Sequence, residues 1–412
     1  MSTPFHSRRG LTRQEIIEYV VAETRACFDT RHPNFRFEKL LGSGAAGVVC
    51  RVIESGTPGA LRDGGADQPG CSRRLVVKRA IGVEGEEDLR NEIAVLKRLR
   101  GAEHIVRIIA GHGDIEQVRP SGFLNRSRDM LDTLWHTARR RPTLGQQKNQ
   151  GTVYDTLLYS FSGPAVMMEY LENGSLGTLL EKLKATNVLL PNRVLWAFCL
   201  CVVRACIAHA YPPDGHEDAP NQLEGILMDR QPTMLGHGDI HAHNIMIGER
   251  SADFAEHNLV PSLKLIDFGR TQESEQEFER MVYDLWLEIL SLITRRDSAY
   301  LPNGQWFGFE TRAVEIQHQD HNHCPMGNGA AYPTLDQVLR EFLAHCVSAD
   351  RERRPSLQQM FVETYLNATK PAAAYQPYEA LESDAAVEKV LASLLLDAQI
   401  VNFSVPYAPR DG

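Results

Sequence analysis

Two short stretches of this chain contain the residue types that phosphoryl transfer needs. The first is His237-Gly-Asp-Ile-His-Ala-His-Asn244, and the second, after a polar insertion, is Leu265-Ile-Asp-Phe-Gly269. Asp239 supplies a carboxylate that can receive a hydroxyl proton, while Asn244 and Asp267 supply an amide and a second carboxylate that can hold Mg²⁺. Their order and spacing match the requirements of phosphate transfer from ATP.

These stretches resemble the catalytic loop and the metal loop of the protein-kinase superfamily. The resemblance implies that Asp239 orients an acceptor hydroxyl and takes its proton. It also implies that Asn244 and Asp267 coordinate Mg²⁺, with Mn²⁺ as a possible substitute. The implied cofactors are therefore ATP and a divalent cation.

Residues further upstream extend the resemblance. Gly42, Gly44 and Gly47 lie in a glycine-rich turn between two predicted strands, which indicates a β-hairpin and not the strand-to-helix turn of a dinucleotide site. Lys78 ends an apolar strand, and the helical period of residues 86–99 places Glu92 on an inner face. By resemblance, the glycines admit the phosphates, and Glu92 holds Lys78 against the α and β phosphates.

The segment from 165 to 176 resembles the hinge between the two lobes of a kinase. The resemblance implies that Met168 lies behind the adenine, that residues 169–171 offer it backbone groups, and that Val49 and Met246 sandwich it under Val77. The predicted nucleotide-binding set is Gly42, Gly44, Gly47, Val49, Val77, Lys78, Met168, Glu169, Leu171, Ser175 and Met246.

Several positions depart from the protein-kinase pattern. Gly238 stands where many regulated kinases have an arginine that grips a phosphorylated loop. Only 17 positions separate Asp267 from Asp284, and no Ala-Pro-Glu motif lies between them. Arg354 resembles the arginine that normally pairs with that glutamate. Its partner stays open among Glu273, Glu275, Glu277, Glu279 and solvent.

His241 stands two residues after Asp239, where protein Ser/Thr kinases usually have lysine. The loop instead resembles that of aminoglycoside- and choline-type kinases, so His241 is a further candidate catalytic residue, with packing within the loop as the alternative. We expect a hydroxyl acceptor that is a small molecule or an atypical protein. The alternatives are a protein Ser/Thr kinase with a non-standard activation segment and a nucleotide-binding pseudokinase or scaffold.

Composition bounds these expectations. The chain has 412 residues, 43% hydrophobic and 24% charged, as in ordinary globular proteins. A formal charge of -9 gives no general attraction to nucleic acid or anionic membrane. No run of 18 apolar residues predicts a membrane span, and no secretory signal is evident. Eight scattered cysteines indicate reduced thiols, so we expect a cytoplasmic or otherwise intracellular protein. Oligomeric state stays open.

The expected fold class is α+β, a bilobal protein-kinase-like fold with a small β-rich N-lobe and a larger, mainly helical C-lobe. The predicted divisions are a helical extension at 1–32, an N-lobe at 33–171 with an insertion at 112–159, a C-lobe at 172–368, and a tail at 369–412 with one helix. Thr12 is the expected N-cap of the helix in the extension, and the insertion is expected to be loop-like after a helix at 126–138. The His-rich loop 318–324 has metal-ligand residue types without regular zinc spacing, which favours a solvated loop. Arg139 to Arg141 form a charge run that is typical of a solvated face.

Overall fold

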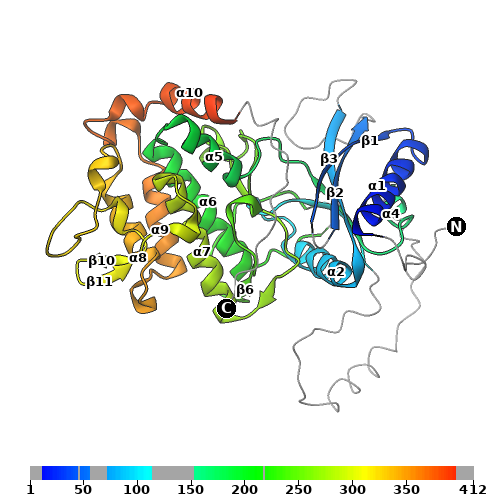
Figure 1. Ribbon diagram of the computed structural model, residues 1–412, viewed down its shortest axis with the longest axis horizontal. Coiled ribbons are helices and arrows are strands. Elements are labelled where there is room, and N and C mark those ends of the chain that lie inside the picture. The colour runs from blue at the N-terminus through cyan, green and yellow to red at the C-terminus, as the bar shows by residue number, and fades with distance from the viewer. Residues whose placement is uncertain (1–11, 45–46, 56–71, 114–152, 217–218, 396–412) are drawn as a thin grey trace, which may run out of the picture.

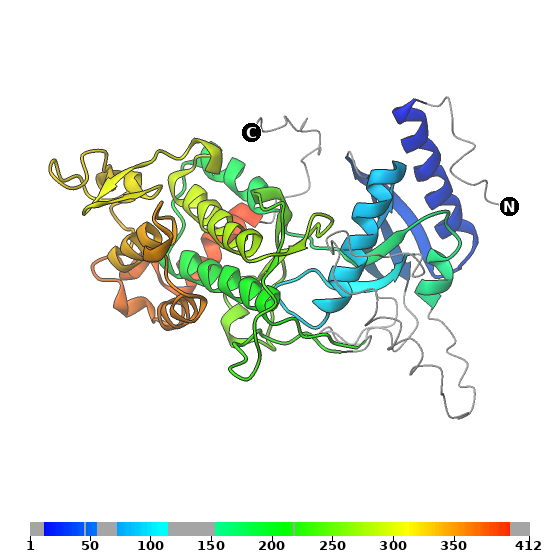
Figure 2. The same cartoon turned by 90° about the horizontal axis from the view of Figure 1, so that it is seen from below.

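A β-sheet with flanking helices lies beside a larger group of helices in the computed structural model, which describes residues 12–44, 47–55, 72–113, 153–216 and 219–395. Figure 2 shows the same two parts from below, with the sheet in blue and cyan. We call them the sheet lobe (residues 12–112 and 153–169) and the helical lobe (residues 172–395). The α+β class expected from the sequence is confirmed.

The sheet lobe is built on five antiparallel strands in the order β1-β2-β3-β5-β4. Their bounds are Phe35–Ser43 (β1), Gly47–Ser55 (β2), Ser72–Ala80 (β3), Ile108–His112 (β4) and Ala165–Glu169 (β5). Side chains on β3 alternate between the two faces of the sheet, as strand geometry requires. Leu75, Val77 and Arg79 are buried on one face, and Val76 and Lys78 lie on the other.

Helix α1 (Arg13–Thr30) covers the face that carries Val77. Thr12 and Glu15 form a capping box at its start, which confirms the predicted N-terminal helix and its cap. Arg79, only 3% exposed, donates to the Val20 carbonyl oxygen and pairs with Glu23 at 2.7 Å, so this strand and this helix are tied together.

Helix α4 (Val153–Leu158) also joins the core of the sheet lobe, through Leu157 and Leu158. It falls inside the predicted insertion at 112–159, whose later part was expected to be loop-like, so that prediction is wrong for 153–158. Residues 114–152 of the insertion, including Arg139 to Arg141, lie outside the described residues. The opposite face of the sheet is covered by helix α2 (Gly82–Arg98), with Glu92 pointing inward and 1% exposed.

The helical lobe is organised around α6, whose side chains are buried along nearly its whole length. Its helices are α5 (Leu176–Thr186), α6 (Asn192–Ala210), α7 (Glu275–Thr294), α8 (Gln337–Cys346), α9 (Leu357–Ala368) and α10 (Asp384–Leu395). Its short strands are β6 (Leu235–Gly236), β7 (Ile245–Ile247), β8 (Leu263–Leu265), β9 (Gln272–Glu273), β10 (Gly304–Trp306) and β11 (Phe309–Thr311). Short 3₁₀ helices include η3 (Ala242–Asn244) and η4 (Ala255–His257).

The predicted tail helix is present as α10 and packs on α5. Val387, Leu391 and Leu394 are buried there, and Lys182 donates to the Leu394 carbonyl oxygen at 2.6 Å. The apolar side chains of this segment therefore serve core packing.

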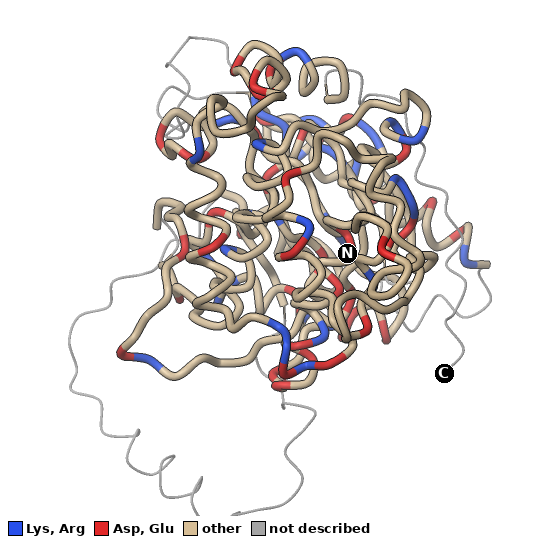
Figure 3. Tube along the Cα trace, turned by 90° about the vertical axis from the view of Figure 1, so that its left-hand side faces the viewer, with Lys and Arg blue, Asp and Glu red and all other residues tan. Residues whose placement is uncertain are grey.

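Helix α6 is long and apolar enough to cross a membrane, alone among the helices of the described residues. One such helix is weak evidence for a membrane span, because the core helix of a globular protein meets the same criterion and 94% of this helix is buried. In the view of Figure 3, segments with basic and with acidic residues are interspersed over the described part of the chain. Seven cysteines are free and buried, as expected; Cys71 lies outside the described residues.

Candidate functional site

Lys78 of β3 joins three elements that are far apart in the sequence. Its Nζ donates to Glu92 Oε2 of α2 at 2.6 Å and to Asp267 Oδ1, just after β8, at 2.8 Å. The Lys78 and Glu92 side chains are 13% and 1% exposed, whereas Asp267 keeps 45% of its surface open. The predicted pairing of Lys78 with Glu92 is therefore formed, and Asp267 meets the same ammonium group.

The charges in this triad depend on one another. Burial disfavours the charge on Lys78, but the carboxylates of Glu92 and Asp267 outweigh it and raise the lysine's pKa. Burial raises the pKa of Glu92, against the opposing effect of Lys78. For Asp267 burial is outweighed by Lys78, which lowers the pKa of this carboxyl and keeps it ionised. Asp267 is thus an anionic oxygen donor that solvent can reach.

The loop that follows β6 positions Asp239 through buried partners. His237 is fully buried and donates from Nε2 to the Ile266 carbonyl oxygen at 2.9 Å, while its Nδ1 accepts the Asp239 N–H at 3.3 Å. Burial lowers the pKa of His237, which fits this neutral form. The ring also packs on Phe268 at 4.8 Å between centroids. The two predicted loops therefore hold each other in place.

Asn244 links the same two loops. Its side-chain nitrogen donates to the Asp239 carbonyl oxygen at 2.9 Å, and its backbone oxygen accepts from the Ile266 N–H at 3.0 Å. Because the nitrogen of the amide is bound within the loop, its oxygen is the end suited to a metal. Asn244 and Asp267 thus bring an amide and a carboxylate to neighbouring positions, an oxygen-donor set that fits Mg²⁺.

Gly238 has a local reason to be glycine. Its φ is +79°, and a Cβ there would overlap the carbonyl oxygen of Arg270. Arg270 follows the second loop directly, and its guanidinium lies 3.8 Å from Asp239 Oδ1. No larger residue fits at 238 while the two loops pack this closely, so the missing arginine of regulated kinases reflects the geometry of this loop.

The glycine-rich hairpin has the predicted strand-turn-strand form. Gly44 N–H donates to the Gly47 carbonyl oxygen at 2.9 Å, and β1 and β2 pair on either side. Gly42 pairs with Val49. A Cβ on Gly47 would overlap the Arg79 carbonyl oxygen, so packing against β3 requires this glycine; no atom lies within 4 Å of a Cβ on Gly44. Of these two glycines, packing therefore requires Gly47 and leaves room for a side chain at Gly44.

The predicted adenine-binding residues divide between the two faces of the sheet. Val49 pairs with Lys78 across β2 and β3 and lies on the same face, and Met168 pairs with Val76. Val77 is 0% exposed in the core beneath α1, so its predicted place above the adenine is wrong. Val76, two residues before Lys78, occupies that face instead. Counting in steps of two from Lys78 would have identified it from the sequence.

Three predicted contacts follow the hinge. Leu171 is buried at 7%, and Met246 of β7 is partly buried beside Ser175, to which it forms a β-bridge. Ser175 is 0% exposed, and its hydroxyl caps α5 by accepting the Thr178 N–H at 3.2 Å. Ser175 is therefore a capping residue, and its predicted contact with a nucleotide is wrong.

Glu169 is held by its side chain at the edge of the hinge. Its carboxylate accepts from the Arg107 N–H at 2.7 Å and from Lys264 at 3.0 Å, and its own N–H donates to the Arg107 carbonyl oxygen at 3.0 Å. These bonds fix the strand that leads into residues 170 and 171.

His241 precedes η3 and accepts the His243 N–H at its Nδ1, at 3.3 Å. It is also close enough to contribute to the lowered pKa of Asp267, after burial and the larger effect of Lys78. The ring therefore supports the loop, as the packing interpretation expected, and the catalytic role of His241 stays a prediction.

Arg354 does not pair with any of the four glutamates considered for it. Its guanidinium stacks on Tyr283 at 4.3 Å and donates to the Ser348 carbonyl oxygen at 2.9 Å, whereas Glu279 pairs with Arg351 at 2.7 Å. The chain from Asp267 reaches α7 at Glu275 by way of β9, which pairs with β6. The segment available to support a peptide is therefore short.

A cavity of about 320 Å³ lies beside the loop that carries Asp239. Its lining residues are Ile240, Tyr283, Asp284, Leu287, Glu288, Ser298, Ala299 and Arg312. Ile240 is the neighbour of Asp239 in the sequence, so the loop that carries Asp239 forms part of the cavity wall. Its size is that of a small-molecule site.

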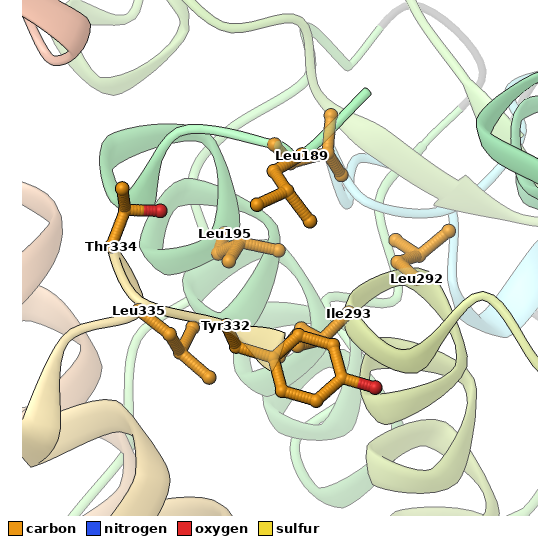
Figure 4. Close-up of a pocket in the computed structure, with 8 residues that line it drawn as sticks. Leu189, Leu195, Leu292, Ile293, Tyr332, Thr334 and Leu335 are labelled. Carbon is orange, nitrogen blue, oxygen red and sulfur yellow. The ribbon is translucent and has the colours of Figure 1, made fainter. Parts of the chain in front are cut away.

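Two other features do not form comparable sites. The apolar pocket of Figure 4, which includes Leu195, Leu292 and Tyr332, has a volume of about 20 Å³, room for about one water. In the His-rich loop, His323 pairs with Asp320 at 2.9 Å, whereas Cys324 is buried and donates to the Val314 carbonyl oxygen. The described side chains of this loop do not form a metal-ligand group.

Comparison of the sequence with protein-family models, and with curated proteins, gives no match to either. The functional interpretation therefore depends on the geometry of the residues themselves.

Proposed function

We propose that this protein is an ATP- and Mg²⁺-dependent phosphotransferase of protein-kinase-like bilobal fold, which transfers the γ-phosphate to a hydroxyl group of a small molecule. The observation that carries the proposal is the contact of Lys78 with both Glu92 and Asp267. A cation held between two carboxylates is fixed in position and suits the phosphates of a nucleotide.

The reaction assigns one task to each group. Asp239 accepts the proton of the acceptor hydroxyl as its oxygen forms the new bond to phosphorus, and the bond between the γ-phosphorus and the bridging oxygen breaks to release ADP. Asn244 and Asp267 would hold Mg²⁺, which neutralises phosphate charge when bound. Lys78 orients the α and β phosphates.

A small-molecule acceptor is favoured by two features near Asp239. The segment between Asp267 and α7 is short, and a cavity of about 320 Å³ opens at Ile240. A peptide substrate needs an extended surface, whereas a metabolite needs an enclosed volume next to the base.

The test uses labelled ATP, Mg²⁺ and fractionated cell extract. We expect label in a small-molecule fraction with the wild-type protein and with Asp253→Asn, an exposed control. Asp239→Asn should transfer label roughly 10²–10⁴-fold more slowly while MgATP still raises its melting temperature. Unchanged transfer by Asp239→Asn would refute the proposal.

The same assay separates the alternatives. Label in protein fractions would indicate a protein kinase. Stabilisation by MgATP without any ADP formed would indicate a nucleotide-binding protein that lacks turnover.

A further inference from the structure

Three metal-ligand side chains meet in the interior, away from the proposed phosphotransfer site. They are His104, in the loop between α2 and β4, Cys201, in the middle of α6, and His257, in η4. One ligand atom from each residue lies within 4.8 Å of the other two, and the residues are 0%, 1% and 2% exposed.

The ring nitrogens of this group have few strong hydrogen bonds. Among the described residues, no hydrogen bond of good geometry reaches Nε2 of His104 or either ring nitrogen of His257, and their polar neighbours are the Cys201 thiol and the Val260 backbone. A buried imidazole normally satisfies both nitrogens, because an unpaired buried polar atom destabilises the folded state. These nitrogens lie on two adjoining rings beside a thiol, an arrangement of donor atoms that can hold a cation.

His104 is oriented as a metal ligand usually is. Its Nδ1 lies 2.6 Å from Glu224 Oε2, and its backbone N–H donates to Glu224 Oε1 at 2.8 Å. A carboxylate on one ring nitrogen fixes the tautomer that leaves the other nitrogen for a metal.

We infer that His104, Cys201 and His257 bind a Zn²⁺ ion. Two imidazoles and a thiolate are a preferred zinc donor set. The charges balance, because the ion's two positive charges meet the Cys201 thiolate and the Glu224 carboxylate. The nearby cations are neutralised separately, Arg204 by Glu256 at 2.7 Å and Lys264 by Glu169 at 3.0 Å.

The geometry requires a small closure around the ion. Tetrahedral zinc places its nitrogen and sulfur ligands about 3.3–3.6 Å apart, as follows from its bond lengths. The ligand atoms here are separated by at most 4.8 Å, so side-chain rotations that move these atoms by about an ångström complete the site. A water can fill a fourth position.

The ion would fasten the sheet lobe to the helical lobe. The His104 carbonyl oxygen accepts the Leu265 N–H at 3.0 Å, and Leu265 lies at the end of β8, two residues before Asp267. Zinc would therefore tie α6 to the strand that leads into Asp267. This role is independent of phosphotransfer.

The first test uses the wild-type full-length chain, so it does not depend on any variant folding. We expect one zinc per chain by mass spectrometry of metals, and a lower melting temperature after removal by a chelator. Replacement by Co²⁺ should produce the thiolate-to-cobalt charge-transfer band and the visible bands of tetrahedral cobalt. The inference would be overturned if the wild-type protein took up neither Zn²⁺ nor Co²⁺ and its melting temperature were unchanged by the chelator.

The second test locates the site. Cys201→Ser should abolish the cobalt charge-transfer band, whereas Cys206→Ser, another buried thiol of α6, should retain it. Glu224→Gln should weaken zinc binding by roughly 10–100-fold. A charge-transfer band of full strength in Cys201→Ser would place the metal elsewhere and refute the assignment.

Discussion

The buried ion pair between Lys78 and Glu92 leads to a quantitative prediction about stability. Replacing Lys78 by methionine keeps the length of the side chain and removes its charge. Glu92 is 1% exposed and lies 2.6 Å from the ammonium, so its carboxylate would be left in the interior without a counter-ion. Loss of one partner of a buried pair costs about 3–5 kcal/mol. Asp267 is 45% exposed, so water replaces much of what it loses.

The loss should depend on pH in a defined direction. Burial raises the pKa of Glu92, and Lys78 opposes this rise in the wild-type protein. Without the lysine the folded-state pKa rises further above the unfolded value, so folding takes up a proton. The free energy of unfolding of Lys78→Met should therefore approach that of the wild type as the pH falls through the folded-state pKa of Glu92.

Urea unfolding followed by tryptophan fluorescence measures the effect. The double variant Lys78→Met/Glu92→Gln removes the stranded charge and should recover most of the lost stability, although it should not recover phosphotransfer. As a matched control, Lys184→Met breaks ion pairs with exposed Glu181 and Asp297 and should cost less than about 1 kcal/mol. Equal stability of the single and double variants would refute the argument.

Three further predictions concern other positions. Gly238→Ala should abolish most turnover, because the added Cβ overlaps the Arg270 carbonyl oxygen. The control is Gly308→Ala, which also lies at positive φ but has open space around the added Cβ. It should lose about 1 kcal/mol of stability and keep its turnover. Val76→Phe should weaken MgATP binding about tenfold or more, measured by calorimetry, since overpacking costs about 1–3 kcal/mol. Burial lowers the pKa of His209 to about 3, so the unfolded state binds a proton that the folded state does not. The free energy of unfolding should therefore fall as the pH drops below the pKa of this histidine in the unfolded chain. His209→Gln should flatten that fall in urea unfolding, and an unchanged dependence of the free energy of unfolding on pH would contradict the role given to His209.

Local patterns predicted most of the elements, since helical periodicity and caps act within a few residues. Helix α1 with its Thr12 cap, α2 with Glu92 inward, and the hairpin around Gly44 agree with the expectations. Helix α4 was missed because a helix of six residues has too few turns for a periodic signal, and it is stabilised by burial of Leu157 and Leu158 on the sheet.

The errors within the candidate site have a common cause. Val77 and Ser175 were assigned by their place in a motif, but the direction of a side chain depends on strand alternation and on packing. Val77 turns to the face under α1, and Ser175 is covered by the start of α5. Resemblance to a motif predicts a position in the chain, whereas the face of the sheet determines what that position can touch.

The sequence by itself determined the candidate phosphotransfer residues, because their residue types and spacing lie within short stretches around Asp239, Asn244 and Asp267. Only the tertiary structure decided that Lys78 meets Glu92 and Asp267 together, that Gly238 is enforced by Arg270, and that a cavity opens at Ile240. It alone brought His104, Cys201 and His257 within 4.8 Å of one another. Each of these contacts joins segments that are distant in the chain, and burial in a shared core is what brings such segments together.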